Sequence, residues 1–233
     1  MKRSELNSII AKAIVFLHAQ NFSLPPFAFW NPKAWAKKGL EADEIRDCML
    51  GWDITDFGSG DFAKVGLVIF TIRNGHMQNP KYTYKPYCEK ILISDVKQVT
   101  PMHFHWSKVE DIINRAGGNL VIQFYASTKT DGLAKSPVVI SVDGVQTTIK
   151  AGGKLVLKPG QSVCIPSRVY HKFWAEKSMV LTGEVSKVND DNIDNRFYEK
   201  IGRFPAIEEN VPPRYLLFSE YPCPGSGPCA KKR

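Results

Sequence analysis

Three side chains able to bind a metal lie within eight residues of one another. They are His103, His105 and Glu110. Alternate side chains of a β-strand point to the same side, so the two histidines share a face, and a turn after Trp106 would return Glu110 to that face. Neutral imidazoles together with a carboxylate suit a divalent transition metal. We therefore expect a metal site here that takes a further ligand from elsewhere in the chain.

A second segment offers that further ligand. It begins with the turn glycine Gly160, continues through a short apolar run to Pro166 and ends at His171. Two histidines at alternate positions would, on their own, fit a surface strand that faces water. The second segment favours the metal site instead, because it brings a third histidine after a turn and a short strand.

Together the two segments resemble the cupin signature. Its first motif, G-x5-H-x-H-x(3,4)-E-x6-G, corresponds to His103-x-His105-x4-Glu110-x6-Gly117. Its second motif, G-x5-P-x-G-x2-H-x3-N, corresponds to Gly160-x5-Pro166-x-Arg168-x2-His171-x3-Ala175. The resemblance implies that four residues are the metal ligands: His103, His105, Glu110 and His171.

The chain departs from the cupin pattern at three positions. Lys97 replaces the leading glycine of the first motif, and Arg168 and Ala175 replace the glycine and the asparagine of the second. None of these positions supplies a metal ligand, so the predicted ligand set is intact.

The chain as a whole is similar to the bacterial D-lyxose isomerases, over roughly residues 1–222. The similarity rests on the segments Phe27–Trp30, Gly51–Gly58, Lys81–Tyr84 and Arg214–Leu216, together with the ligand segment and its Lys108. It implies a metal-dependent cupin enzyme that interconverts D-lyxose and D-xylulose, and also D-mannose and D-fructose. It further implies a homodimer with a small sugar as its substrate.

Many short apolar strands separated by Gly, Pro and Asn turns predict a β-sandwich or barrel. With the cupin motifs, the expected fold is all-β, a cupin jelly-roll β-barrel with additional N-terminal helices. An apolar stripe predicts a helix over residues 4–20 with Ser4 as its N-cap. Asn74-Gly75 and Asp143-Gly144 predict tight hairpins. We expect one cupin domain with an N-terminal helical extension over residues 1–222, and a flexible tail over residues 223–233.

Composition excludes several classes of function. The net charge is +8, but the basic residues are scattered and form no patch with interleaved aromatics, so no nucleic-acid partner is expected. No apolar run approaches the ~18 residues of a membrane span, so no membrane partner is expected. The five cysteines form no CxxC pair and predict no disulfide framework, which favours a cytoplasmic protein.

Isomerisation of this kind needs a Lewis acid that holds O1 and O2 and a group that moves a proton between C1 and C2 through a cis-enediol. Glu184 is the expected base. Lys108 is the expected acid or electrostatic partner, and either a neutral or a charged form of it is compatible with the sequence. Both residues could instead be ordinary solvated side chains. A hydride shift is an alternative to proton transfer.

Several other residues are candidates for contact with the sugar. The run 189–196 is polar and predicts a loop that can close over the site. Each candidate has a plainer role as a surface or core side chain. The candidate substrate-binding residues are Lys90, Trp30, Asp191, Asp194 and Arg214.

The predicted cofactor is a divalent metal, with Mn²⁺ expected and Co²⁺, Ni²⁺, Zn²⁺ and Fe²⁺ compatible with the same ligands. Two other functions fit a cupin with these ligands. A metal dioxygenase would favour an open, largely apolar pocket, and a non-catalytic sugar-binding cupin would use the metal without turnover.

Overall fold

A computed structural model describes residues 1–188, 190–202 and 206–224 of the protein. Helical segments come first: α1 (Arg3–Ala19), η1 (Pro26–Phe29), α2 (Pro32–Trp35), η2 (Leu40–Ala42) and α3 (Asp43–Asp47). Strands follow as β1 (Gly51–Thr55), β2 (Leu67–Arg73), β3 (Tyr87–Ser94), β4 (Val99–His105), β5 (Glu110–Ala126), β6 (Val138–Val142), β7 (Val145–Ile149), β8 (Lys154–Leu157), β9 (Ser162–Ile165), β10 (Val169–Lys187) and β11 (Asn195–Phe197). The short helix η3 (Phe218–Glu220) lies near the end of the described chain.

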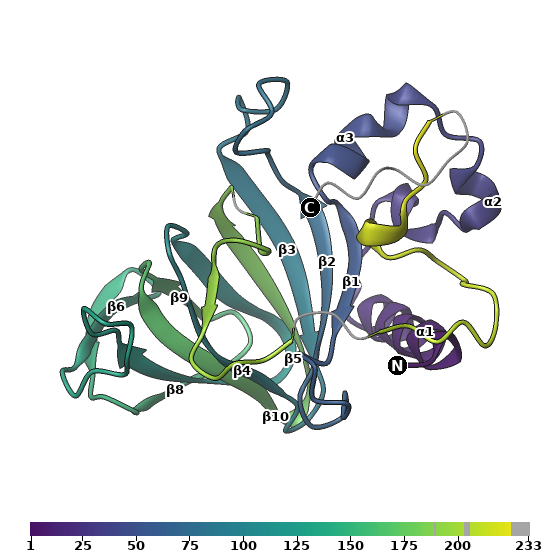
Figure 1. The fold of residues 1–233 in the computed structure, drawn as a ribbon. Helices are drawn as coiled ribbons and strands as arrows, with labels where there is room; N and C mark the ends of the chain where they lie inside the picture. The colour runs from purple at the N-terminus through teal and green to yellow at the C-terminus, as the bar shows by residue number, and fades with distance from the viewer. Residues whose placement is uncertain (189, 203–205, 225–233) are drawn as a thin grey trace.

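The strands form one antiparallel network in the order β1-β2-β3-β10-β5-β9-β6-β7, with β4, β8 and β11 attached at its sides. The two longest strands, β5 and β10, pair with each other along most of their length and lie at the centre of this network (Figure 1). The first part of β10 also pairs with β4, and its second part pairs with β3. This one strand therefore connects β4 to the sheet of β1, β2 and β3. An all-β fold with N-terminal helices is therefore confirmed.

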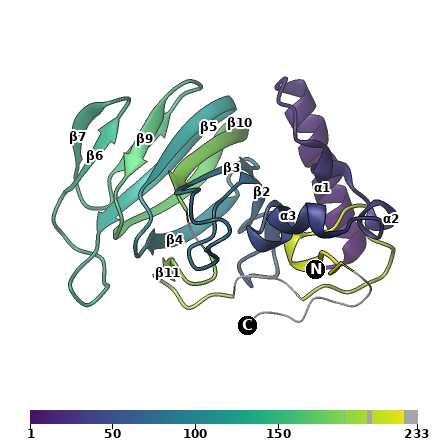
Figure 2. The same cartoon turned by 90° about the horizontal axis from the view of Figure 1, so that it is seen from above.

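The sheet formed by β1, β2 and β3 is buried on both faces. Trp52, Ile54 and Phe70 pack outward against the apolar stripe of α1, and Figure 2 shows α1 beside β2, far from β6 and β7. Leu67 and Ile69 alternate with these residues and pack inward, into the barrel. Burial on both faces explains why β2 is a nearly continuous apolar run. In β1 the outward residues are apolar, whereas the inward ones, Asp53 and Thr55, are polar but also buried.

The start of α1 differs from the sequence prediction. The helix begins at Arg3, and its cap position is Lys2, which makes no side-chain capping bond, so the prediction of Ser4 as N-cap is wrong. The buried Arg3 side chain instead forms ion pairs with Glu209 and Glu220. The start of α1 is therefore held by packing and by the ion pairs of Arg3, and not by a capping hydrogen bond from a serine hydroxyl.

The two predicted hairpins have different outcomes. Val142 pairs with Val145 across Asp143 and Gly144, which both have positive φ, so that tight hairpin is confirmed. At Asn74-Gly75 the strand ends as predicted and β2 pairs antiparallel with the next strand, β3, but residues 74–86 connect them, so the tight turn is wrong.

The end of the chain is only partly covered by the structure. The predicted tail lies outside the described residues except for 223 and 224. Cys223 takes part in a disulfide bond, so the expectation of unpaired cysteines is wrong there. Within the described ranges, no helix is long and apolar enough to span a membrane.

Candidate metal centre and active site

Strand pairing brings the three histidines together. His103 and His105 lie on one face of β4, and His171 of β10 is the direct cross-strand partner of His103. Their ligand atoms all lie within 4.8 Å of one another, and all three residues are buried. Side chains paired across an antiparallel ladder stand on the same face. The grouping therefore follows from the register of β4 and β10.

Backbone contacts fix the state of two imidazoles. Nδ1 of His103 lies 2.8 Å from the carbonyl oxygen of Pro101, and Nδ1 of His171 lies 3.0 Å from that of Val169. A carbonyl oxygen only accepts hydrogen bonds, so both Nδ1 atoms carry the proton and both Nε2 atoms keep a free lone pair. A ring N–H that donates to a backbone carbonyl in this way is typical of metal-binding histidines.

Glu110 begins β5 and faces the histidines. Its Oε1 atom lies 3.1 Å from Nε2 of His171 and 3.3 Å from Nε2 of His105. Among the described residues, this buried oxygen accepts no geometrically acceptable hydrogen bond. A carboxylate oxygen that faces an imidazole lone pair in a buried place is unfavourable unless a cation lies between them. The donor set therefore fits a divalent metal.

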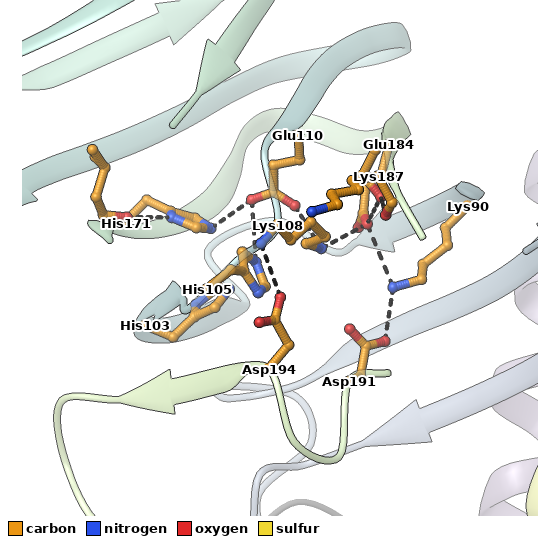
Figure 3. A network of polar contacts seen from close by, with 12 residues as sticks. Lys90, His103, His105, Lys108, Glu110, His171, Glu184, Lys187, Asp191 and Asp194 are labelled. Carbon is orange, nitrogen blue, oxygen red and sulfur yellow. Dashed lines mark hydrogen bonds and ion pairs between the residues drawn. The ribbon is translucent and has the colours of Figure 1, made fainter. Parts of the chain in front are cut away.

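A series of buried charges leads away from the histidines (Figure 3). Nζ of Lys108 lies 2.7 Å from Glu110 and 2.7 Å from Glu184. Glu184 is also 3.4 Å from Nζ of Lys90, which in turn is 2.8 Å from Asp191. In Figure 3, His171 and Lys90 lie at opposite ends, with Glu110, Lys108 and Glu184 between them. Sequence reasoning named every member of this series.

The pKa shifts follow from burial and these contacts. Burial, reinforced by the neighbouring histidines, holds the pKa of His103 well below its ordinary value. Burial disfavours the charged forms of Glu110 and Lys108. The attraction between the two opposite charges, together with their other neighbours, outweighs this cost for both residues. The pKa of Glu110 is therefore lowered and that of Lys108 raised, and the ammonium form of Lys108 is favoured over the neutral one.

The loop after β10 is anchored to the turn that carries Lys108. The Asp194 carboxylate accepts hydrogen bonds from the backbone N–H of Ser107 and of Lys108, at 2.9 and 3.1 Å, and from the Ser107 hydroxyl at 2.9 Å. Asp191, in the same loop, reaches Lys90. Residues 190–194 of the predicted loop therefore contact the site through two aspartates, whereas residues 195 and 196, which were also predicted to be loop, belong to β11.

A cavity of about 560 Å³, part of it open to solvent, is lined by the three histidines, Glu110, Lys108, Glu184, Lys90 and Asp191, but not by Asp194. Its wall also contains four polar residues that sequence reasoning missed as site residues: Asp53, Thr55, Thr100 and Asn195. The polar–apolar alternation of Asp53 and Thr55 with Trp52 and Ile54 is a signal that would have found two of them. Asn195 carries no such signal, because its strand, β11, has only three residues.

Besides Asp194, two predicted residues do not line the cavity. Trp30 packs against Trp35, with a ring-centroid distance of 5.2 Å, and the Lys38 ammonium lies over its ring. Arg214 is exposed, and its backbone N–H donates to Asn7. Neither residue lines the cavity within this chain.

Comparison with known proteins agrees with this geometry. A family described as D-lyxose isomerase matches residues 1–221. A D-lyxose/D-mannose isomerase of Serratia proteamaculans is 46% identical over 224 residues, covering 95% of this chain and 98% of the relative. A protein of the same name from Escherichia coli O157:H7 is 44% identical with the same coverage.

Solved structures of sugar isomerases share the fold. An L-ribose isomerase of Cellulomonas parahominis with L-ribose has a TM-score of 0.59 at 16% identity, covering 89% of this chain and 98% of that one. The L-ribose complex of the Acinetobacter sp. DL28 enzyme has a TM-score of 0.55 at 16% identity, covering 86% and 93%. The predicted cupin jelly-roll architecture is confirmed by this likeness. From the family match and its relatives, the chain belongs to the D-lyxose isomerase family of sugar isomerases.

Proposed function

We propose that the protein is a metal-dependent aldose–ketose isomerase that interconverts D-lyxose and D-xylulose, and D-mannose and D-fructose. The observation that carries this proposal is the continuous series from the three histidines through Glu110 and Lys108 to Glu184. In this series three histidines that could hold a metal are followed by a buried carboxylate and a buried ammonium, which supports the proposal because the reaction needs these groups.

We assign the metal to His103, His105, His171 and Glu110, where it would supply Lewis-acid polarisation of the sugar carbonyl. Glu184 takes the proton from C2 of the aldose and returns it to C1 of the ketose. The Lys108 ammonium stabilises negative charge on the substrate oxygen while the proton is in transit. Asp194 positions Lys108 through the backbone of the preceding turn.

Two neutral polar atoms favour a polyhydroxy substrate. Thr100 and Asn195 line the cavity, and Oγ1 of Thr100 and Oδ1 of Asn195 are buried and have no hydrogen-bond partner among the described residues. A buried polar atom without a partner costs about 1–3 kcal/mol, which a substrate hydroxyl would remove. Together with the charged series, this favours a sugar over the apolar substrate of a dioxygenase.

An anaerobic assay with D-lyxose and the metal-loaded protein tests this proposal. D-Xylulose should form without oxygen uptake, and the histidine variant His103→Ala should abolish its formation. Oxygen consumption with another substrate, and no turnover of D-lyxose, would favour the dioxygenase. Saturable sugar binding without product would favour the non-catalytic cupin.

We further propose that the native metal is Mn²⁺, that residues 1–222 form one domain, and that the protein is a cytoplasmic homodimer. The mixed nitrogen and oxygen ligand set supports Mn²⁺ together with other divalent metals. Metal analysis of the purified protein tests the first proposal, and light scattering at several concentrations tests the homodimer.

A further inference from the structure

A second cavity of about 290 Å³ lies next to the first. Met49, Thr71, Asn74, Asn192 and Phe218 line it, and it contains no histidine. Three further residues line both cavities, namely Asp53, Lys90 and Asp191. The ion pair between Lys90 and Asp191 therefore lies where the two cavities meet, at the end of the charged series farthest from the histidines.

Strand register connects the catalytic carboxylate to this second cavity. Glu184 is the cross-strand partner of Lys90, and Lys90 is the partner of Thr71 on the next strand. Paired side chains stand on the same face of a sheet, so these three residues form one row across β10, β3 and β2. A substrate whose reacting end lies at the histidines would extend along this row.

The two substrate pairs differ only at the far end of the sugar. D-Lyxose and D-mannose have the same configuration at C2, C3 and C4, and D-mannose adds one CH(OH) unit to the chain. Both sugars can therefore place C1 and C2 identically at the metal end, and the additional carbon and hydroxyl must be accommodated at the opposite end. A buried hydroxyl needs hydrogen-bonding partners there.

We propose that the second cavity receives the terminal hydroxymethyl group of six-carbon substrates, and that its walls determine the preference between hexoses and pentoses. This inference rests on the proposed isomerase function. Most of the residues that line the cavity are polar, which suits a hydroxyl. The pentose ends at the Lys90–Asp191 pair, whereas the hexose reaches past it towards Thr71 and Asn192.

The test is the ratio of kcat/KM for D-mannose to that for D-lyxose in the metal-loaded protein. Asn192 is exposed on the loop, and its side chain lies 3.9 Å from Sδ of Met49, so Asn192→Phe narrows the cavity from its rim without changing the core. We expect this variant to lower the ratio at least tenfold. The neighbouring Ile193 is exposed and lines neither cavity, so Ile193→Phe is the matched control and should leave the ratio unchanged.

Thr71→Leu narrows the same cavity from β2 and should also lower the ratio. Thermal melting confirms that each variant is folded. An unchanged ratio in both variants, or an equal loss for both sugars, would overturn the inference. Wild-type protein that converts D-lyxose but not D-mannose would also overturn it while leaving the isomerase proposal intact. Protein that converts neither sugar would refute the isomerase proposal itself.

Discussion

The two faces of β3 and β10 differ in what they bury. On the outer face, Ile91 and Leu181 pack with α1 in an apolar cluster. On the inner face, Lys90, next to Ile91, and Glu184, three residues after Leu181, are also buried but charged. Burying an ion costs several kcal/mol even after relaxation, whereas burying a leucine contributes about 1.5–3 kcal/mol. The apolar outer face therefore stabilises the fold. The buried charges of the inner face do not, and we attribute them to the proposed reaction.

Ion pairs between the buried charges offset part of the cost of burying them on the inner face. Each lysine contacts two carboxylates, and Glu184 contacts two lysines. Removing the central charge of Glu184 thus leaves Lys108 paired with Glu110 and Lys90 paired with Asp191. The comparison predicts that substitutions on the inner face change turnover more than stability, and that substitutions on the outer face do the reverse.

The largest expected effect is that of Glu184→Gln. It removes the proposed base while keeping its shape, so kcat should fall by about 10²- to 10⁴-fold. Bound metal should stay at the wild-type level, and the unfolding free energy should fall by less than in Leu181→Ala. Activity within twofold of wild type would show that Glu184 is not the proton-transfer group.

Leu181→Ala tests the outer face. Truncation of this fully buried leucine should lower the unfolding free energy by about 2–5 kcal/mol through lost burial and a residual cavity. Urea denaturation measures the change, and kcat at a temperature where the variant is folded should match wild type. A large loss of kcat in folded protein would mean that the two faces are not separable.

Asp194→Asn should have a smaller effect on catalysis. It weakens charge-assisted hydrogen bonds to the turn that carries Lys108, each worth about 1.5–3 kcal/mol. We expect kcat to fall roughly tenfold with a nearly unchanged KM, because the residue positions Lys108 rather than contacts the sugar. A selective rise in KM would instead support the original prediction of a substrate contact.

The smallest effect concerns Cys88, two residues before Lys90 on the inner face. Burial raises the pKa of its thiol to about 12, although the charge of Lys90 acts in the opposite direction. A raised folded-state pKa stabilises the protein below the unfolded pKa, and this stabilisation is lost as the pH rises through the folded value. Between pH 8 and 11, the unfolding free energy of wild type should therefore fall more steeply than that of Cys88→Ala, and equal slopes would contradict this.

His171 joins the other ligands through the pairing of β10 with β4, a contact between distant segments that only the resemblance to the cupin motifs indicated. Alternation along one strand was enough to place His103 and His105 on the same face. The hairpin at Asp143-Gly144 was predictable for the same reason. Both rest on local geometry that the residues themselves specify.

Contacts between distant segments could not be read in this way. Asp194 was predicted to meet the sugar, but its position depends on how the loop closes over the turn at Ser107. Ser4 has the right chemistry for a cap, yet ion pairs of Arg3 with residues more than 200 positions away accompany a different helix start. Trp30 and Arg214 lie away from the cavity because the N-terminal and C-terminal segments pack on the outer side of the sheet.

The central claim is that the inner face performs isomerisation with a metal at its histidine end. The most direct test is to strip the protein of metal, add Mn²⁺ back in increments, and measure D-xylulose formation from D-lyxose together with bound metal. We predict no turnover without metal and a rate that rises in proportion to occupancy up to one ion per chain. Metal-free protein that turns over D-lyxose at the rate of the loaded protein would contradict the account.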